Sequence, residues 1–256
     1  MPQNATFHDL KDASVFITGG GSGIGAALTE GFCEQGAKVA FVDLQESSAF
    51  AAEVGERTGV TPLFIKCDIT DTTAMKDAMA SAKAVHGPIT TLVNNAANDK
   101  RHLTKDVTDE FYDWMMSINL KAYFFACQTV IPQMQEAGFG SIINFSSISY
   151  MMGHPDYPLY TAANSGINGM SRSLARSFGP DRIRVNAVMP GWVITPRQQE
   201  LWVTEESLAS HIERQCLKDK IVAEDMVGGV LFLASDASKM MTGQALVIDA
   251  GVVVTG

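Results

Sequence analysis

The chain of 256 residues is 46% hydrophobic and 18% charged, which suits a single soluble domain large enough to bury a substantial core. Its net charge of −9 argues against nucleic acid or an acidic membrane as a partner, and we expect neither a secretory signal nor a membrane span. Its 4 cysteines lie far apart without metal-ligand spacing, so we expect reduced thiols, no metal site and a cytoplasmic location.

Short apolar runs alternate along the chain with longer amphipathic segments. We expect strands at 14–18, 38–43, 62–68, 90–95, 140–147, 183–190 and 245–251. Each run is almost continuously apolar, which is typical of parallel strands covered on both faces. Helices are expected between most of them, at 23–35, 71–85, 107–136 and 160–178. The pattern predicts one α/β domain over 1–256, a doubly wound, seven-stranded parallel sheet with helices on both faces.

One segment departs from this alternation. Residues 191–222 form a long excursion between the last two expected strands, with mixed polar and aromatic content. Inserted segments of this kind often cover active sites, so we expect a lid there.

A glycine-rich turn, TGGGSGIG at 18–25, follows the first strand directly and opens the first helix. Its glycines allow a pyrophosphate to approach the backbone, where the helix N-terminus offers unpaired N–H groups. A glycine turn alone is weak evidence, but its place between strand and helix favours a dinucleotide site. We expect Gly19, Ser22, Gly23 and Ile24 to contact the cofactor.

Acidic side chains end the next two strands. Asp43 is placed to accept hydrogen bonds from the ribose hydroxyls of adenosine, and a 2′-phosphate there would meet its carboxylate. The cofactor is therefore predicted to be NAD rather than NADP. Asp68 is placed to meet the adenine, with Ile69 packing beside it. An equally good interpretation makes Asp68 the N-cap of the following helix.

Several further motifs resemble the short-chain dehydrogenase/reductase family over essentially the whole chain. They are the glycine turn, NNAA at 94–97, Asn119, Ser147 thirteen residues before Tyr160, and PGWVIT at 190–195. The resemblance implies a single-domain Rossmann fold, usually tetrameric and without a metal. It implies that Val193 and Thr195 hold the carboxamide of the nicotinamide, and Asn95, Ala96 and Pro190 are also expected to bind the cofactor.

The site departs from the family pattern at two positions, Ala97, where the family usually has glycine, and Asn164 in the reacting centre. The resemblance makes Tyr160 the base that takes a hydroxyl proton and Ser147 the group that holds the substrate oxygen. A tyrosine has an ordinary pKa of about 10, and in the family a lysine one helical turn later lowers it. Here Asn164 occupies that place, on the same helix face, without a charge. Asn119 matches the position that supports this lysine through a water.

Because the other site positions match, we favour an impaired enzyme over a protein that binds NAD without catalysis. Tyr160, Asn164, Ser147 and Asn119 are the expected catalytic set, and Tyr160 and Asn164 are also expected at the cofactor. In this interpretation turnover is slow at neutral pH and rises toward the tyrosine pKa.

The substrate prediction rests on segments outside the common motifs, at 94–102 and in the lid. Together they are similar to bacterial sugar 1-dehydrogenases, which oxidise galactose or a pentose to its lactone. Uncharged polar side chains for several sugar hydroxyls, and one indole for a pyranose face, fit this class. The expected substrate residues are Asn98, Ser147, Ser149, His154, Tyr160, Trp192 and Gln198. A carbonyl reductase for an apolar ketone is the second enzyme interpretation.

A small-residue face on the helix at 160–178 adds one expectation about assembly. Ala162, Ala163, Gly166 and Gly169 let another backbone approach closely. Together with the family resemblance, this face predicts a homotetramer.

Overall fold

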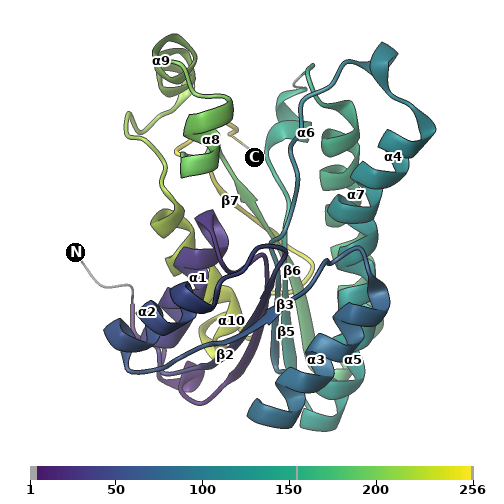
Figure 1. The fold of residues 1–256 in the computed structure, drawn as a ribbon, viewed down its shortest axis with the longest axis vertical. Coiled ribbons are helices and arrows are strands. Elements are labelled where there is room, and N and C mark those ends of the chain that lie inside the picture. Colours follow the sequence, from purple (N-terminus) through teal and green to yellow (C-terminus); the bar gives the residue numbers. More distant parts are fainter. Residues whose placement is uncertain (1–4, 154, 255–256) are drawn as a thin grey trace.

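Seven parallel strands form a single sheet in the computed structural model, which describes residues 5–153 and 155–254 (Figure 1). The strands are β1 (Ser14–Thr18), β2 (Lys38–Asp43), β3 (Leu63–Lys66), β4 (Thr91–Asn94), β5 (Gly140–Phe145), β6 (Ile183–Pro190) and β7 (Ala245–Ile248). Their order across the sheet is β3-β2-β1-β4-β5-β6-β7. The chain moves outward from β1 to β3, then returns to pair β4 with β1 and moves outward again. Ligands of such sheets bind where this order reverses, beyond the carboxyl ends of the strands.

Helices cover both faces of the sheet, as the sequence predicts (Figure 1). One face carries α1 (Gly23–Glu34), α2 (Ser48–Thr58) and α10 (Val227–Ala234), which share a core with Ile17, Phe41 and Val188. The other carries α3 (Thr72–His86), α5 (Ala122–Ala137) and α7 (Pro158–Phe178), packed on Phe16 and Leu92. All residues of β1, β4 and β5 are buried, which explains why their sequences are almost continuously apolar.

The predicted helix at 107–136 contains a change of winding. It consists of α4 (Asp109–Met116), a π-helical turn η3 (Ser117–Lys121) and α5. Within the π turn, the side-chain amide of Asn119 donates a hydrogen bond to the carbonyl oxygen of Met115 at 2.9 Å. Such π turns occur mostly as single insertions in α-helices and are frequent at functional sites.

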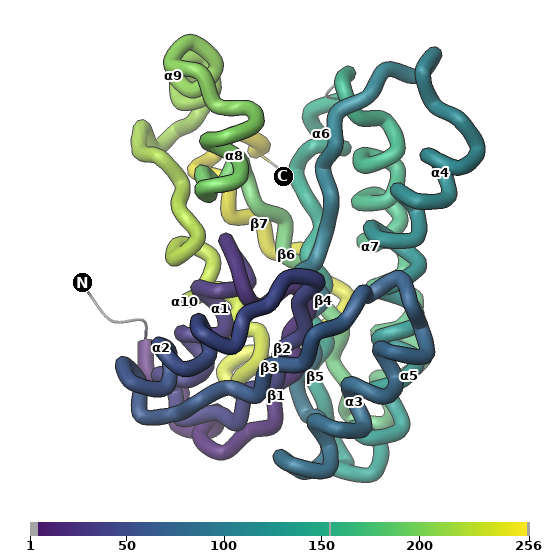
Figure 2. The backbone as a smooth tube through the Cα atoms, viewed as in Figure 1, coloured from purple at the N-terminus to yellow at the C-terminus, as the bar shows by residue number. Residues whose placement is uncertain are grey.

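The excursion at 191–222 is folded rather than extended. It contains α8 (Pro196–Leu201) and α9 (Glu205–Arg214), which stand beyond the carboxyl ends of the strands, across from α6 (Ser149–Met152) (Figure 2). Its two ends are joined, because the backbone N–H of Ile194 donates to the carbonyl oxygen of Ile221 at 2.8 Å. The excursion therefore closes on itself as a unit above the sheet.

Short 3-10 turns complete the connections. They are η1 (His8–Leu10), η2 (Thr104–Asp106), η4 (Gly179–Asp181), η5 (Ala223–Met226) and η6 (Asp236–Ser238). Across residues 5–153 and 155–254, no helix has both the length and the hydrophobicity to span a bilayer. The same residues contain no cluster of three or more His, Cys, Asp or Glu side chains suited to a metal ion.

Candidate active site

A cavity of about 960 Å³ lies at the carboxyl ends of the strands, between the sheet and the lid. Every residue predicted to bind the cofactor lines it: Gly19, Ser22, Gly23, Ile24, Asp43, Asp68, Ile69, Asn95, Ala96, Tyr160, Asn164, Pro190, Val193 and Thr195. Of the predicted substrate residues, Asn98, Ser147, Ser149, Tyr160, Trp192 and Gln198 line the same cavity. His154 lies outside the described residues. The sequence thus brings the two predicted groups together in one space.

The glycine turn after β1 has the geometry of a phosphate cradle. Gly19 and Gly23 have φ angles of 65° and 52°, in the left-handed region that favours glycine. A Cβ on Gly25 would lie 1.8 Å from the carbonyl oxygen of Gly19, so no larger residue fits there. Ser22 begins α1 without capping it through its side chain. The first turn of α1 can therefore offer its N–H groups to a pyrophosphate, which fits a dinucleotide.

Asp43 is held in place at the end of β2. One carboxylate oxygen accepts from the backbone N–H of Gly21 at 3.0 Å, and the other accepts from that of Gln45 at 3.1 Å. These bonds tie the carboxylate to the glycine turn while it still lines the cavity. The position fits an acceptor for ribose hydroxyls.

The two interpretations of Asp68 can be separated. Its carboxylate accepts from the N–H and the hydroxyl of Thr70, at 2.9 and 2.7 Å. The N-cap of α3 is Asp71, whose side chain accepts from two backbone N–H groups of the first turn. The capping interpretation of Asp68 is therefore wrong, because the cap lies three residues later. Asp68 remains at the cavity wall beside Ile69.

Asn95 supports the glycine turn from the neighbouring strand. Its side-chain amide donates to the carbonyl oxygens of Thr18 and Gly19, at 3.1 Å each. The backbone of Ala96 is so near that a Cβ on Gly19 would stand 3.0 Å from its Cα. These contacts fix the spacing between β1 and β4 at the point where the sheet order reverses.

Asn119 does not line the cavity but braces the loop that does. Its side-chain oxygen accepts from the N–H of Asn98 at 2.8 Å, and its amide donates to the carbonyl oxygen of Asn98 at 3.0 Å. Asn119 is 2% exposed, so its side of both bonds is shielded from water. It acts here as a positioning residue for the loop after β4.

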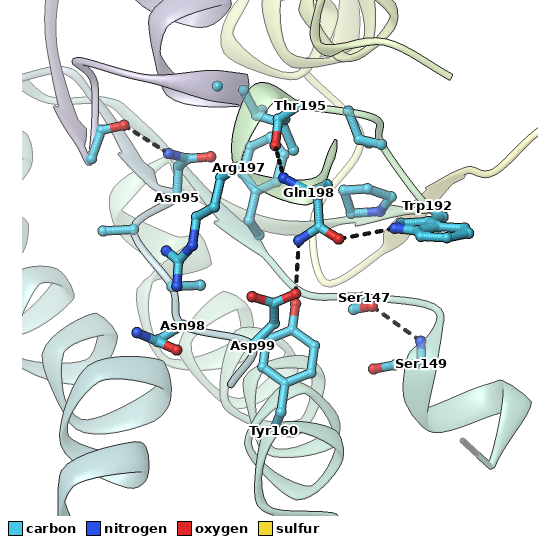
Figure 3. A pocket seen from close by; sticks show the side chains of 18 of the residues that line it. Asn95, Asn98, Asp99, Ser147, Ser149, Tyr160, Trp192, Thr195, Arg197 and Gln198 are labelled. Carbon is cyan, nitrogen blue, oxygen red and sulfur yellow. Dashed lines mark hydrogen bonds between the residues drawn. The ribbon is translucent and has the colours of Figure 1, made fainter. Parts of the chain in front are cut away.

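Tyr160 lies in the first turn of α7, which forms the wall of the cavity opposite the lid (Figure 3). Burial raises its pKa well above the ordinary tyrosine value, and the negative charge of Asp99 raises it further. Hydrogen bonding by Ser147 and Asn164 lowers the pKa, but less than burial raises it. A phenol in this environment keeps its proton at neutral pH.

Asn164 cannot supply the missing charge. Its side chain is 3% exposed, and its amide donates to the backbone carbonyl oxygen of Tyr160, four residues earlier, at 2.8 Å. The backbone carbonyl oxygen of Asn164 accepts from the hydroxyl of Ser146 at 2.9 Å and from the side-chain amide of Asn168 at 3.0 Å. The residue is thus fully built into α7 as a neutral structural group.

A chain of hydrogen bonds crosses the cavity from the loop after β4 to the lid (Figure 3). The amide of Gln198 donates to the carboxylate of Asp99 at 2.8 Å, and its oxygen accepts from the indole N–H of Trp192 at 2.9 Å. Both ends of the Gln198 side chain are engaged. Asp99 was not among the predicted site residues, although it stands just after the predicted Asn98.

The polar residues predicted for the substrate differ in their local bonds. The hydroxyl of Ser149 is buried and has no partner among the described residues, while its backbone N–H donates to the hydroxyl oxygen of Ser147 at 3.1 Å. The side-chain oxygen of Asn98 accepts from the N–H of Lys100 at 3.0 Å. Trp192 meets His211 edge to face, with centroids 5.3 Å apart. Their contacts with a sugar remain predictions.

Arg101 is a second residue that the sequence did not place in the site. Its guanidinium carbon lies 5.2 Å from the ring centroid of Tyr157 and 4.9 Å from that of Trp202, and all three line the cavity. The Nε of Arg101 and the indole nitrogen of Trp202 are buried without a partner in the described part of the chain. Arg101 also forms an ion pair with Asp156 at 3.7 Å, which ties the loop after β4 to the segment before α7.

Known proteins resemble this chain over almost its full length. Residues 19–253 match the sequence family described as enoyl-(acyl carrier protein) reductase. The chain is 51% identical to the "Probable galactose dehydrogenase GalD" of Rhizobium meliloti, covering 97% of this chain and 98% of that protein. It is 45% identical to the D-xylose 1-dehydrogenase of Caulobacter vibrioides, with 97% and 98% covered.

The fold has a counterpart among solved structures. A crystal structure of a "putative short-chain alcohol dehydrogenase" from Sinorhizobium meliloti 1021 superposes with a TM-score of 0.90. The two chains are 30% identical, and the match covers 96% of this chain and 98% of the other.

Proposed function

Because the chain belongs to the short-chain dehydrogenase/reductase family, and its relatives include sugar dehydrogenases, we propose that it oxidises the C1 hydroxyl of an aldose to the lactone with NAD. The coarse activity, a sugar-dehydrogenase type of oxidoreductase with a nicotinamide cofactor, follows from the family and these relatives. The choice of NAD and the lactone product are our proposal.

One observation carries the proposal. The predicted dinucleotide residues and the predicted substrate residues, His154 apart, share one cavity, with Tyr160 common to both groups. When bound, NAD supplies the acceptor for the hydride of C1. The protein residues then have to hold the sugar oxygen beside Tyr160 and Ser147 and to exclude water.

Asp43 supports NAD over NADP. Its carboxylate is fixed by Gly21 and Gln45 at the cavity wall, where a 2′-phosphate would meet a negative charge. The next residue, Leu44, is 59% exposed and gives no positive partner for such a phosphate.

A sugar suits the polar end of the cavity better than an apolar ketone. The buried hydroxyl of Ser149, the Nε of Arg101 and the indole N–H of Trp202 are all without partners among the described residues, and all three residues line the cavity. Hydroxyl groups of a sugar can satisfy such atoms, whereas an apolar ligand would leave them unpaired at a cost of about 1–3 kcal/mol each.

The state of Tyr160 sets the expected activity through the tyrosine route. Its phenol stays protonated at neutral pH, because burial and Asp99 raise its pKa and Asn164 brings no charge. We therefore propose that proton transfer to Tyr160 is slow in this chain. Tyr160 and Ser147 keep the task of hydrogen-bonding the substrate oxygen.

The test is NAD reduction at 340 nm with galactose, arabinose and xylose from pH 7 to 10.5, beside the same assay with NADP and with an apolar ketone plus NADPH. Oxidation of at least one aldose with NAD is expected. NAD binding without reduction of NAD by any of the sugars would instead favour the non-catalytic NAD-binding alternative.

We also propose a cytoplasmic homotetramer. All 4 cysteines are free thiols, which suits a reducing compartment. On α7, Ala162 and Gly169 are exposed, while Ala163 is buried and Gly166 faces Leu120, so only part of the small-residue face is open to a partner. Light scattering at micromolar concentration should give four times the chain mass, and a monomer would refute the assembly.

A further inference from the structure

We propose that Asp99, rather than Tyr160, accepts the proton of the sugar hydroxyl that is oxidised. The inference rests on the proposed function and names a base for it. Asp99 and Tyr160 line the same cavity, and both point into the space below Gln198 (Figure 3). Asp99 is also the charged group that acts most strongly on the Tyr160 phenol.

The position of Asp99 is fixed from two sides. Its carboxylate accepts from the side-chain amide of Gln198 at 2.8 Å. The side-chain oxygen of Gln198 in turn accepts from the indole N–H of Trp192 at 2.9 Å, which holds Gln198 in place. At its other side, the loop that carries it is tied to Asn119 through both backbone groups of Asn98. A carboxylate held this way keeps lone pairs free for a further donor, because Gln198 occupies one oxygen.

The charge balance of the cavity favours a carboxylate base over a phenolate. Tyr160 has a negative neighbour in Asp99 and a neutral one in Asn164, so a second negative charge on the phenol is opposed. A carboxylate, in contrast to a phenol, is ionised in water at neutral pH. Tyr160 then stays a donor that orients the sugar oxygen, and its proton never leaves.

The O–H bond of the C1 hydroxyl breaks and its proton moves to an Asp99 oxygen, while its electron pair becomes the second C–O bond of the lactone. The C1–H bond breaks and its hydrogen leaves with both electrons as hydride, which bound NAD would accept. The proton on Asp99 is released to solvent after the product departs.

Other titratable groups must be kept constant in a test. Those lining the cavity on the substrate side are Arg101, Tyr123, Tyr157, Arg197, His211 and Arg214. Burial, and then Arg214, lower the pKa of His211, so this side chain is neutral from pH 7 upward. Burial raises the pKa of Tyr123 and that of Tyr157, so both phenols keep their protons at pH 7 to 9. When kcat of the variants is compared between pH 7 and 9, these other side chains keep their charge. Differences in kcat then report on Asp99 and Tyr160.

The experiment compares Asp99→Asn, Asp99→Ala and the exposed control Asp113→Asn in NAD reduction with the best aldose. Asn keeps the acceptor for Gln198 but cannot take a proton, so kcat should fall by about 100-fold or more with KM within threefold. Sodium formate, but not sodium chloride, should restore part of the activity of Asp99→Ala. Asp113→Asn should match the unmodified chain.

A second measurement does not depend on turnover. Tyrosinate absorbance at 295 nm, taken as the difference between the chain and Tyr160→Phe with NAD but without sugar, should show no phenolate of Tyr160 between pH 7 and 9. A phenolate in that range, an Asp99→Asn variant with unchanged kcat, or one with a raised KM alone would overturn the inference while leaving the proposed function intact. Failure of the unmodified chain to oxidise any aldose would refute both.

Discussion

Replacing Asn164 by lysine should open the tyrosine route that this chain lacks. Asn164 lines the cavity one helical turn after Tyr160, so an ammonium at this position can reach the side of the phenol. An opposite charge within about 4–6 Å lowers a pKa by about 1–3 units. While the pKa of Tyr160 stays above the assay pH, each unit gives tenfold more phenolate, so the phenolate fraction at pH 7 should rise about 10- to 1000-fold.

The substitution also has a structural cost that must be separated from this gain. The 2.8 Å bond from the Asn164 amide to the Tyr160 carbonyl oxygen is lost, at about 1 kcal/mol of unfolding free energy. Asn164→Met loses the same bond and has a long side chain without a charge, so it is the matched control. Urea unfolding should show both variants destabilised by similar amounts.

Turnover through Tyr160 is best seen where Asp99 cannot act. In an Asp99→Asn background, kcat with NAD and aldose should be higher with Lys than with Met at position 164, and should rise with pH between 7 and 10. The 295 nm signal of Tyr160 should move to lower pH by the same 1–3 units. Equal activity and equal tyrosine titration for the Lys and Met variants would refute the electrostatic account of position 164.

Three further outcomes are expected. Asp43→Ser combined with Leu44→Arg should shift the ratio of NADP to NAD affinity by at least about tenfold toward NADP, measured by fluorescence titration, and equal binding of both cofactors by the unmodified chain would contradict the role of Asp43. Gly25→Ala should abolish NAD binding and lower the free energy of unfolding, because its Cβ would stand 1.8 Å from the Gly19 carbonyl oxygen; retained binding would show that the turn can shift. Burial raises the pKa of the Cys127 thiol from 9.0 to about 12, so the unfolded chain ionises first and stability falls between these pH values, by about 1.4 kcal/mol per pH unit from this thiol. Urea unfolding of Cys127→Ser should show a smaller loss between pH 9 and 10.5, and an identical loss would exclude this thiol as a cause.

The sheet could be predicted because its strands are buried on both faces, and strands buried in this way have almost continuously apolar sequences. Of the helices that cover the two faces of the sheet, α2 and α10 were not predicted. In α10 the sequence VGGVLFLA is apolar all round and contains two glycines, so it has no polar face to mark a helix. α2 is a short helix between β2 and β3, and its burial is limited to Ala51 and Val54.

The cofactor residues could be predicted because they sit at strand ends and in a turn whose geometry the sequence specifies locally. Asp99 could not, because its partner Gln198 is 99 positions away in the lid. Arg101 depends in the same way on Trp202, which follows α8. Hydrophobic periodicity predicts neither the path of the lid nor which side chains it brings over the cavity.

Asparagine instead of the family's lysine at position 164 changes the electrostatics around Tyr160 without disturbing the backbone of α7. The hydroxyl of Ser146 and the amide of Asn168 bond the backbone carbonyl of Asn164, and these contacts do not depend on its side chain. α7 can therefore keep Tyr160 in place whether a cation is present or not. What changes is the sign of the charge that acts on the phenol, which is the negative carboxylate of Asp99 rather than a positive ammonium. A phenol beside a negative charge keeps its proton, so Tyr160 acts as a hydrogen-bond donor rather than as a base. The proton of the substrate hydroxyl is then better accepted by the carboxylate of Asp99.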